Sequence, residues 1–126
     1  MEHEQTTRIP VAPERLYRTI ADVGNLTRFI PPLHSVRRTD PGHVEVEAQY
    51  EGHEQRGQAW FRADDEAKRV EWGSEGQPYR GWMQVEPDGD GSTLTLHVTT
   101  ERLTSDHLGE VKAYVASTIE SLRKLF

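Results

Sequence analysis

The chain has 126 residues and a mass of 14.4 kDa, which predicts a single domain spanning residues 1–126. Its 15 Lys and Arg against 21 Asp and Glu give a formal net charge of −6, which argues against a nucleic-acid partner because phosphate binding needs clustered basic residues. There is no cysteine, which excludes disulfides and thiolate metal ligands. The first residues are polar, which predicts that they are not a signal peptide, and no stretch approaches the ~18 apolar residues that stable membrane insertion needs. We therefore expect a cytoplasmic protein.

One strand and two short helices are predicted at the beginning of the chain. Residues Glu2–Ile9 contain strand-forming Thr and Ile, and a proline follows them. A helix then begins near Pro13, since proline is tolerated in the first helical turn. Asp22 can cap a second short helix, which Pro31 and Pro32 end.

The central part of the chain alternates apolar and polar residues with a period of two, which is typical of strands. Turn residues interrupt the alternation, among them residues 40–43, a two-residue loop at Gly52 and His53, and a polar loop at residues 64–68. The predicted strands cover residues 33–40, 43–51, 54–63, 69–74, 79–87 and 92–102. Together they predict a six-strand antiparallel meander.

A single long helix is predicted at the end of the chain. Ser105 or Asp106 can cap its beginning, and apolar residues then recur at three- and four-residue spacing. These residues are Leu108, Val111, Val115, Ile119, Leu122 and Phe126. A helix with one apolar stripe has to pack against another surface. We therefore expect it to lie on the sheet, which is the large surface available.

The hairpin loops predict which residues face one another across the strands, and therefore which residues face the helix. Two inner rows result, Val44–Phe61–Val70–Met83–Leu96 and Val46–Ala59–Trp72–Gly81–Val98. In this register Trp72 has two small neighbours, Ala59 and Gly81. The next row is Ala48–Gly57–Ser74–Tyr79–Thr100, with Tyr50 and Gln55 beyond it. The change from apolar to small, hydroxyl-bearing side chains is typical of a pocket with a wetter mouth; a plain core with polar edges is the alternative.

The opposite face of the sheet carries the predicted row Glu45–Trp60–Glu71–Trp82–His97. Trp60 and Trp82 either form a cross-strand cluster that covers the sheet or contact a second copy of the chain in a homodimer. The first strand of the meander fits the pattern less well, because Val36 falls opposite Glu47. A bulge near residues 37–38 would bring that strand into phase.

No motif in the sequence specifies a catalytic reaction or a metal site. The His-Glu pairs at residues 3–4 and 53–54 lack the second histidine of a zinc-binding helix, so we expect no metal and no cofactor. Tyr50 or Tyr79 can donate a proton to a carbonyl, as an aromatic cyclase requires. The same two residues can equally line the edge of a core, with the hydroxyl group reaching water. The catalytic residues of any enzyme activity stay open.

The order of these elements resembles the helix-grip fold of the START-like (SRPBCC) superfamily over essentially the whole chain. The local features are Ile9-Pro10 followed by Pro13-Glu14, and then Phe29-Ile30-Pro31, which are similar to small bacterial members of the polyketide cyclase/dehydrase and lipid-transport group. The resemblance implies an α+β fold with a curved antiparallel sheet of about seven strands, in which the first strand pairs with the last. It also implies that the long C-terminal helix packs on the concave face, with a hydrophobic ligand cavity between helix and sheet.

Three functions are compatible with this sequence. We favour a carrier or sensor that binds a small hydrophobic ligand, such as a lipid or an aromatic polyketide-like molecule. The alternatives are a cyclase/dehydrase-type enzyme and a protein-interaction module that uses Trp60 and Trp82. The residues predicted to bind the ligand are Tyr50, Gln55, Ala59, Phe61, Trp72, Ser74, Tyr79, Met83, Val98, Thr100, Val111 and Val115.

Overall fold

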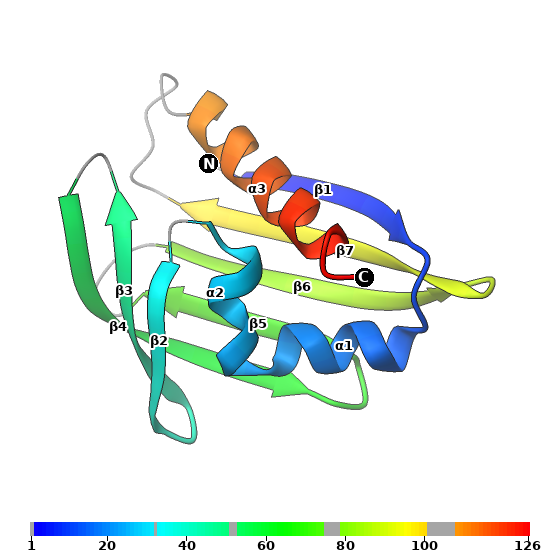
Figure 1. Cartoon of the computed structure of the whole chain (residues 1–126), viewed down its shortest axis with the longest axis horizontal. Coiled ribbons are helices and arrows are strands. Elements are labelled where there is room, and N and C mark those ends of the chain that lie inside the picture. Colours follow the sequence, from blue (N-terminus) through cyan, green and yellow to red (C-terminus); the bar gives the residue numbers. More distant parts are fainter. Residues whose placement is uncertain (1, 32, 51–52, 75–78, 101–107) are drawn as a thin grey trace.

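The computed structural model describes residues 2–31, 33–50, 53–74, 79–100 and 108–126. The elements are β1 (Glu2–Ile9), α1 (Pro13–Ala21), the 3-10 helix η1 (Val23–Asn25), α2 (Leu26–Phe29), β2 (Leu33–Asp40), β3 (His43–Tyr50), β4 (His53–Asp64), β5 (Arg69–Ser74), β6 (Tyr79–Asp88), β7 (Gly91–Thr100) and α3 (Leu108–Arg123) (Figure 1). Each predicted strand is present, with ends that differ from the prediction by two residues or fewer. The predicted capping residues of α3 lie outside the described residues.

The seven strands form one antiparallel sheet in the order β1-β7-β6-β5-β4-β3-β2. Helices α1, α2 and α3 lie on the same face of this curved sheet (Figure 1). Helix α1 contacts β5, β6 and β7, whereas α3 contacts β1, β7 and α2, and α2 contacts β2. The pairing of β1 with β7 and the position of α3 confirm the α+β helix-grip architecture.

Local sequence explains how the chain enters this fold. Pro13 stands in the first turn of α1, where its missing N–H removes no hydrogen bond. Leu16 and Ile20 are one helical turn apart, and both are completely buried against the sheet. The Asp22 carboxylate accepts a hydrogen bond from the backbone N–H of Gly24 at 2.9 Å, and this caps η1 as predicted.

Two of the predicted strand registers are wrong by two residues. Val46 pairs with Gly57 instead of Ala59, because His53 belongs to β4 and pairs with Tyr50. The predicted loop at residues 52–53 is therefore displaced; Gly52 itself lies outside the described residues. A shift of two residues leaves every side chain on its predicted face, because side chains alternate with a period of two.

The second wrong register joins β4 and β5, where Phe61 pairs with Trp72 instead of Val70. The centre of the connecting loop lies one residue later in the chain than the predicted register requires, and the Asp64 carboxylate holds the loop in this position. This carboxylate accepts hydrogen bonds from the backbone N–H groups of residues 66 and 67, both at 3.1 Å, and Lys68 adopts a left-handed φ of 53°. The registers of β5 with β6 and of β6 with β7 agree with the prediction.

Strand β2 is irregular, as its sequence pattern predicted. The register shifts between Arg38 and Asp40, next to the predicted bulge, and shifts again between Leu33 and Ser35, which was not predicted. Val36 consequently pairs with Val46 instead of Glu47 and packs against the core. The two irregularities thus keep both apolar residues of this strand, Leu33 and Val36, packed against the core.

One end of the sheet is closed by α1. Tyr17 is almost completely buried there, and its hydroxyl donates a hydrogen bond to Asp65 Oδ1 at 2.5 Å. Lys68 forms an ion pair with Glu14 at 3.3 Å, so two contacts tie α1 to the loop between β4 and β5. Burial of the phenol and the neighbouring Asp65 raise the pKa of Tyr17 well above its ordinary value of 10.0.

Candidate functional site

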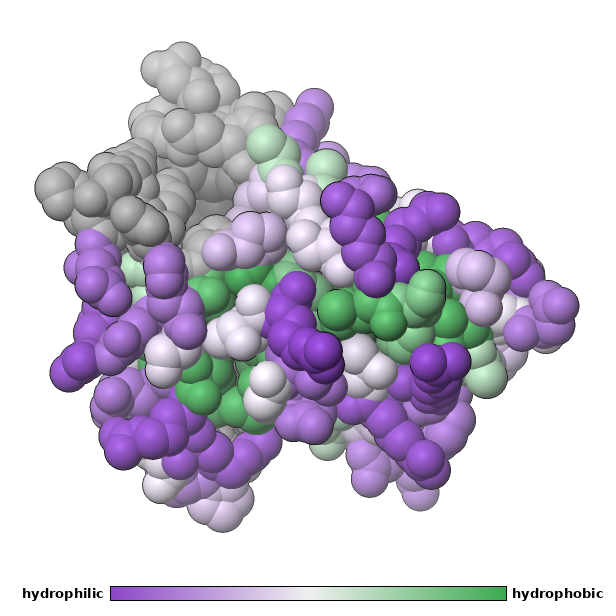
Figure 2. All heavy atoms as spheres, viewed as in Figure 1, coloured by the Kyte–Doolittle hydropathy of each residue, from purple (hydrophilic) through white to green (hydrophobic). Residues whose placement is uncertain are grey.

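The described side chains at the opposite end of the sheet are less completely buried. Strands β3, β5 and β7 end there and α3 begins there, away from α1 (Figure 1). Seven half-buried apolar or aromatic side chains face inward from the elements that reach this end: Ile30, Leu33, Val46, Ala59, Trp72, Tyr79 and Tyr114. A space-filling view also shows apolar atoms exposed between polar ones on the face that carries the helices (Figure 2). Partly exposed apolar walls of this kind are typical of a ligand site.

A cluster of hydroxyl groups lies among these apolar side chains. The indole Nε1 of Trp72 donates a hydrogen bond to the Tyr79 hydroxyl at 3.4 Å. The Tyr79 hydroxyl in turn lies near enough to Tyr114 of α3 to raise the pKa of that phenol. Thr118 follows Tyr114 by one helical turn and is 1% exposed. We call Trp72, Tyr79, Tyr114 and Thr118 the hydroxyl cluster.

Thr118 differs from the rest of the hydroxyl cluster because its hydroxyl is not satisfied. Its Oγ1 lies near enough to Tyr114 to lower the pKa of that phenol, yet it makes no hydrogen bond of good geometry in the described part of the chain. A buried polar atom without a partner destabilises a protein by about 1–3 kcal/mol. Such an atom is therefore a common sign of a place where another molecule supplies the partner.

The electrostatic environment of the cluster disfavours negative charge. Burial raises the pKa of Tyr114 well above its ordinary value, and the nearby Tyr79 adds to the increase. Tyr114 therefore keeps its proton at neutral pH. It can donate a hydrogen bond there, but it cannot act as a general base.

The position of the Trp72 indole requires a glycine on the neighbouring strand. A Cβ atom at Gly81 would lie 2.6 Å from Cζ2 of Trp72, so the indole lies across β6 where no side chain stands. Of the two small neighbours predicted for Trp72, Gly81 is confirmed. Ala59 is wrong, because the shifted register places Phe61 beside Trp72.

The predicted ligand-binding residues fall into three groups. Phe61, Met83, Val98 and Val115 are buried in the core. Ala59, Trp72, Ser74 and Tyr79 are half-buried on the inner face. The side chains of Tyr50, Gln55, Thr100 and Val111 lie outside those that the structure describes.

Sequence reasoning missed Tyr114 and Thr118. A signal was present, since Tyr114 lies three residues after Val111 and Thr118 three residues after Val115. Both positions therefore belong to the buried stripe of α3. They were missed because the stripe was identified from its fully apolar residues alone, which leaves out tyrosine and threonine.

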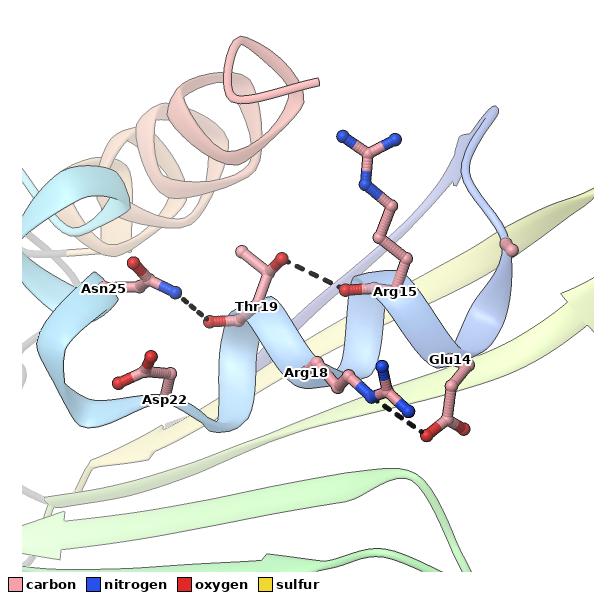
Figure 3. Close-up of a pocket in the computed structure, with 7 residues that line it drawn as sticks. Glu14, Arg15, Arg18, Thr19, Asp22 and Asn25 are labelled. Carbon is pink, nitrogen blue, oxygen red and sulfur yellow. Dashed lines mark hydrogen bonds and ion pairs between the residues drawn. The ribbon is translucent and has the colours of Figure 1, made fainter.

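An open depression of about 490 Å³ beside α1 is a poorer candidate for the site (Figure 3). Its lining is mostly polar: Ala12, Glu14, Arg15, Arg18, Thr19, Asp22 and Asn25. Arg18 pairs with Glu14 at 3.3 Å, and the Thr19 hydroxyl donates to the Arg15 carbonyl at 3.0 Å. These groups satisfy one another, so they offer little to a ligand.

The outer face of the sheet carries both remaining tryptophans. Trp82 stacks on His97 with ring centroids 5.2 Å apart, and the guanidinium of Arg69 lies 4.1 Å from the centroid of Trp82. Trp60 lies over Gly73, and Arg62 covers its ring at 5.2 Å. Charged side chains therefore cover a cross-strand aromatic cluster. The homodimer through Trp60 and Trp82 stays a prediction.

Metal binding and membrane insertion find no support in the described ranges. Among these residues no three His, Asp or Glu side chains gather in a group that could hold a metal ion. No helix in the same part of the chain is both long enough and apolar enough to cross a bilayer.

Comparisons with known proteins agree with this architecture. The family model described as "Polyketide cyclase / dehydrase and lipid transport" matches residues 2–126. The protein TTHA0849 from Thermus thermophilus is similar in structure, with a TM-score of 0.79 at 22% identity over 98% of this chain and 95% of that chain. A START superfamily protein from Mycobacterium smegmatis gives a TM-score of 0.76 at 13% identity, covering 99% of each chain.

An enzyme has the same fold. The Zhui aromatase/cyclase from Streptomyces sp. R1128 gives a TM-score of 0.75 at 14% identity, over 98% of this chain and 92% of that chain. Comparison with curated proteins gives no match. At these identities the solved structures show the fold alone, whereas the family model covers nearly every residue. The chain belongs to the polyketide cyclase/dehydrase and lipid-transport family.

Proposed function

We propose that this protein binds a small hydrophobic ligand, such as a lipid or an aromatic polyketide-like molecule, between the inner face of the sheet and α3. The observation that carries the proposal is the set of seven half-buried apolar and aromatic side chains at the end of the sheet away from α1. Exposing this much apolar surface has a free-energy cost of about 25 cal/mol per Å², which a bound apolar molecule would offset. We propose that it acts as a carrier or sensor in the cytoplasm, which is compatible with its composition.

The charge pattern also supports an apolar ligand. The described inward-facing residues of β4, β5, β6 and β7 include no charged side chain. The acidic and basic residues of these strands alternate outward, where several pair with each other, as Arg69 does with Glu71 at 2.8 Å. A charged ligand would therefore find no counter-ion among the described inward-facing side chains of these four strands.

Native mass spectrometry followed by solvent extraction tests the proposal. We expect the purified protein to carry a reproducible apolar molecule that denaturation releases. In Ala59→Phe a ring fills the half-buried site on β4, and less of the molecule should be retained. Ala63→Phe is the matched control, because Ala63 lies on the same strand and inner face but is exposed. Equal retention by both variants would contradict the proposed location.

A cyclase or dehydrase activity is the second candidate. It is favoured by the neighbouring phenols of Tyr79 and Tyr114 inside the fold, since a protonated phenol can donate its proton to a substrate carbonyl. Full turnover of a polyketide-like substrate by the Tyr79→Phe, Tyr114→Phe double variant would show that neither hydroxyl is needed for such a mechanism.

The interaction module that uses Trp60 and Trp82 is the third candidate. It predicts that Trp60→Ala abolishes self-association.

A further inference from the structure

The helices on the inner side of the sheet differ in charge from the rest of the chain. Residues 13–29, which form α1, η1 and α2, and residues 108–126, which include α3, hold six basic and four acidic residues, a net charge of +2. The other residues hold nine basic and seventeen acidic ones, a net charge of −8. The chain is therefore acidic as a whole, whereas its helix layer is basic.

Five basic side chains of the helix layer are exposed to solvent, and we call them the helix-layer cations. They are Arg15 and Arg18 of α1, Arg28 of α2, and Arg123 and Lys124 at the end of α3. The Arg15 guanidinium lies 5.3 Å from the ring centroid of Phe126, so α1 meets the end of the chain there. Arg15 and Arg18 also border one depression with Asn25, whose Oδ1 accepts a hydrogen bond from Arg28 at 3.5 Å. These contacts join the cations of the three helices into one surface.

Most of the helix-layer cations have no carboxylate partner. Within the described ranges Arg18 pairs with Glu14 at 3.3 Å, and the other four form no ion pair. Glu14 extends from the side of α1 opposite to Arg15 (Figure 3). The two further acidic side chains described on this layer are Asp22, which caps η1, and Glu120. Exposed cations that lack a partner create a positive potential, which attracts an anionic surface.

Apolar groups are exposed beside these cations. Phe126 is 36% exposed next to Arg15, and Figure 2 shows further apolar atoms between polar ones on the face that carries the helices. An anionic lipid bilayer matches both properties, because its phosphates attract basic side chains and its acyl boundary accepts apolar ones. The proposed apolar ligand favours the same partner, since such a molecule partitions into lipid rather than water.

The acidic residues elsewhere in the chain leave this surface largely undisturbed. Glu71 and Glu86 are examples that face outward from the far side of the sheet. A layer of helices is about 10 Å thick, and the Debye length at about 0.1 M salt is also about 10 Å, so salt screens these carboxylates from a bilayer at the helix layer. The acidic loop nearest to α1 includes Asp65, which accepts a hydrogen bond from Tyr17.

We propose that the helix layer docks on an anionic lipid bilayer through the helix-layer cations, with Phe126 entering the headgroup region. The contact is peripheral, so it requires no membrane-spanning helix. As a step in which a carrier collects or releases an apolar ligand, this inference rests on the proposed function. It adds the partner that supplies the ligand and the face that meets it.

Sedimentation with vesicles tests the inference. One set of vesicles is pure phosphatidylcholine, and the other contains two parts phosphatidylcholine and one part phosphatidylglycerol. Each Lys or Arg close to an anionic surface contributes about 1 kcal/mol, which is a factor of about five in the partition coefficient. We therefore expect the protein to bind the mixed vesicles roughly tenfold or more tightly than the neutral ones at about 0.1 M salt. Raising the salt to about 0.5 M should release it.

Charge reversals assign the binding to one face. Arg28→Glu and Lys124→Glu should each lower the partition coefficient for the mixed vesicles by roughly fivefold or more. Arg80→Glu is the matched control, because Arg80 is exposed on the outer face of β6 and the substitution changes the net charge by the same amount. Phe126→Trp reports on the apolar contact, since its fluorescence, compared with that of the parent, should shift to shorter wavelength when vesicles bind.

The outcomes separate the docking inference from the proposed function. If the protein does not sediment with the mixed vesicles, or if Arg80→Glu weakens binding as much as the two helix-layer reversals, the docking inference is wrong. An unshifted Phe126→Trp emission would contradict the part assigned to Phe126. Retention of the co-purified apolar molecule, measured by native mass spectrometry on the same preparations, decides the ligand-binding function separately. A protein that retains this molecule but ignores the vesicles keeps the function and loses the docking surface.

The reverse result also has a definite meaning. A protein that binds the mixed vesicles through Arg28 and Lys124 but carries no apolar molecule has the docking surface without the carrier function.

Discussion

The two ends of the sheet are built from the same strands but differ in how completely side chains cover them. At the end under α1, Leu16, Ile20 and Leu94 are each 0% exposed. At the other end, Ala59 and Trp72 are half-buried, and the buried Thr118 hydroxyl has no partner among the described residues. We call these the closed end and the open end.

The difference shows that this fold separates stability from binding along the length of its strands. The closed end is packed as a protein interior, where the loss of each methylene group is felt. The open end keeps apolar surface and polar donors available, which lowers its contribution to folding. Substitutions of similar size should therefore have unequal effects on stability at the two ends.

Leu94→Ala at the closed end should have the largest effect. It removes a completely buried side chain from β7 and leaves a cavity, so we expect the free energy of unfolding to fall by about 2–5 kcal/mol. Urea denaturation followed by circular dichroism measures this change. A loss below about 1 kcal/mol would mean that the closed end is not the rigid core described above.

Gly81→Ala tests the close approach between Trp72 and β6. The new Cβ would also lie 2.9 Å from the His97 carbonyl oxygen, so we expect a loss of about 1–3 kcal/mol and a change in tryptophan fluorescence as the indole moves. Gly57→Ala is the matched control on β4, because nothing lies within 4 Å of a Cβ there in the described part of the chain. Equal losses in both variants would show that the strain is not specific to Trp72.

Tyr17→Phe weakens the link that holds α1 over the closed end. Removing the hydrogen bond to Asp65 should lower the free energy of unfolding by about 1–2 kcal/mol at pH 7. The pKa of Tyr17 is raised in the folded protein above its ordinary value of 10.0, so the folded state holds the phenolic proton more tightly. This contribution is complete below about pH 10 and is lost as the pH rises further.

Measuring the effect of Tyr17→Phe at two pH values is the control for this prediction. In urea unfolding at about pH 7 and about pH 11, the difference between the parent and Tyr17→Phe should shrink at the higher pH. A difference that stays constant would show that the Tyr17 proton does not contribute to the link.

Tyr79→Phe at the open end should have the smallest effect on stability. The hydroxyl is half-buried and its bond from Trp72 is long, at 3.4 Å, so we expect a change of less than about 1 kcal/mol. Retention of the co-purified ligand should nevertheless fall clearly. If stability falls as much as in Leu94→Ala, then the distinction between the two ends is wrong.

Periodicity made the faces of the sheet predictable, but not the register of its pairs. The alternation of β4 and β5 assigns Phe61 and Trp72 to the inner face whichever residues they pair with. Which residues meet depends on the loop between these strands, where the Asp64 carboxylate and the left-handed Lys68 fix a position of the turn that propensity does not reveal.

At the open end, the residues that lie on the sheet were predicted from the sequence, whereas those that lie on α3 were not. Trp72, Ser74 and Tyr79 were identified because the rows of a sheet can be written down from its turns. Thr118 was not, since a threonine within an aliphatic stripe is an ordinary packing residue until its hydroxyl is seen to lack a partner in the described structure. That property depends on three-dimensional surroundings, which a single sequence does not contain.

The pairing of β1 with β7 has a consequence for the order of folding. Glu2 pairs with Thr99 and Ile9 with Ser92, so the first strand of the fold finds its partner almost at the end of the meander. During synthesis β1 leaves the ribosome before every other element and has to wait, unpaired, until β7 follows. Contacts this distant in sequence slow folding, because the intervening chain must close before they form. The docking of β1 is therefore expected among the last steps, after the β2–β7 meander has assembled.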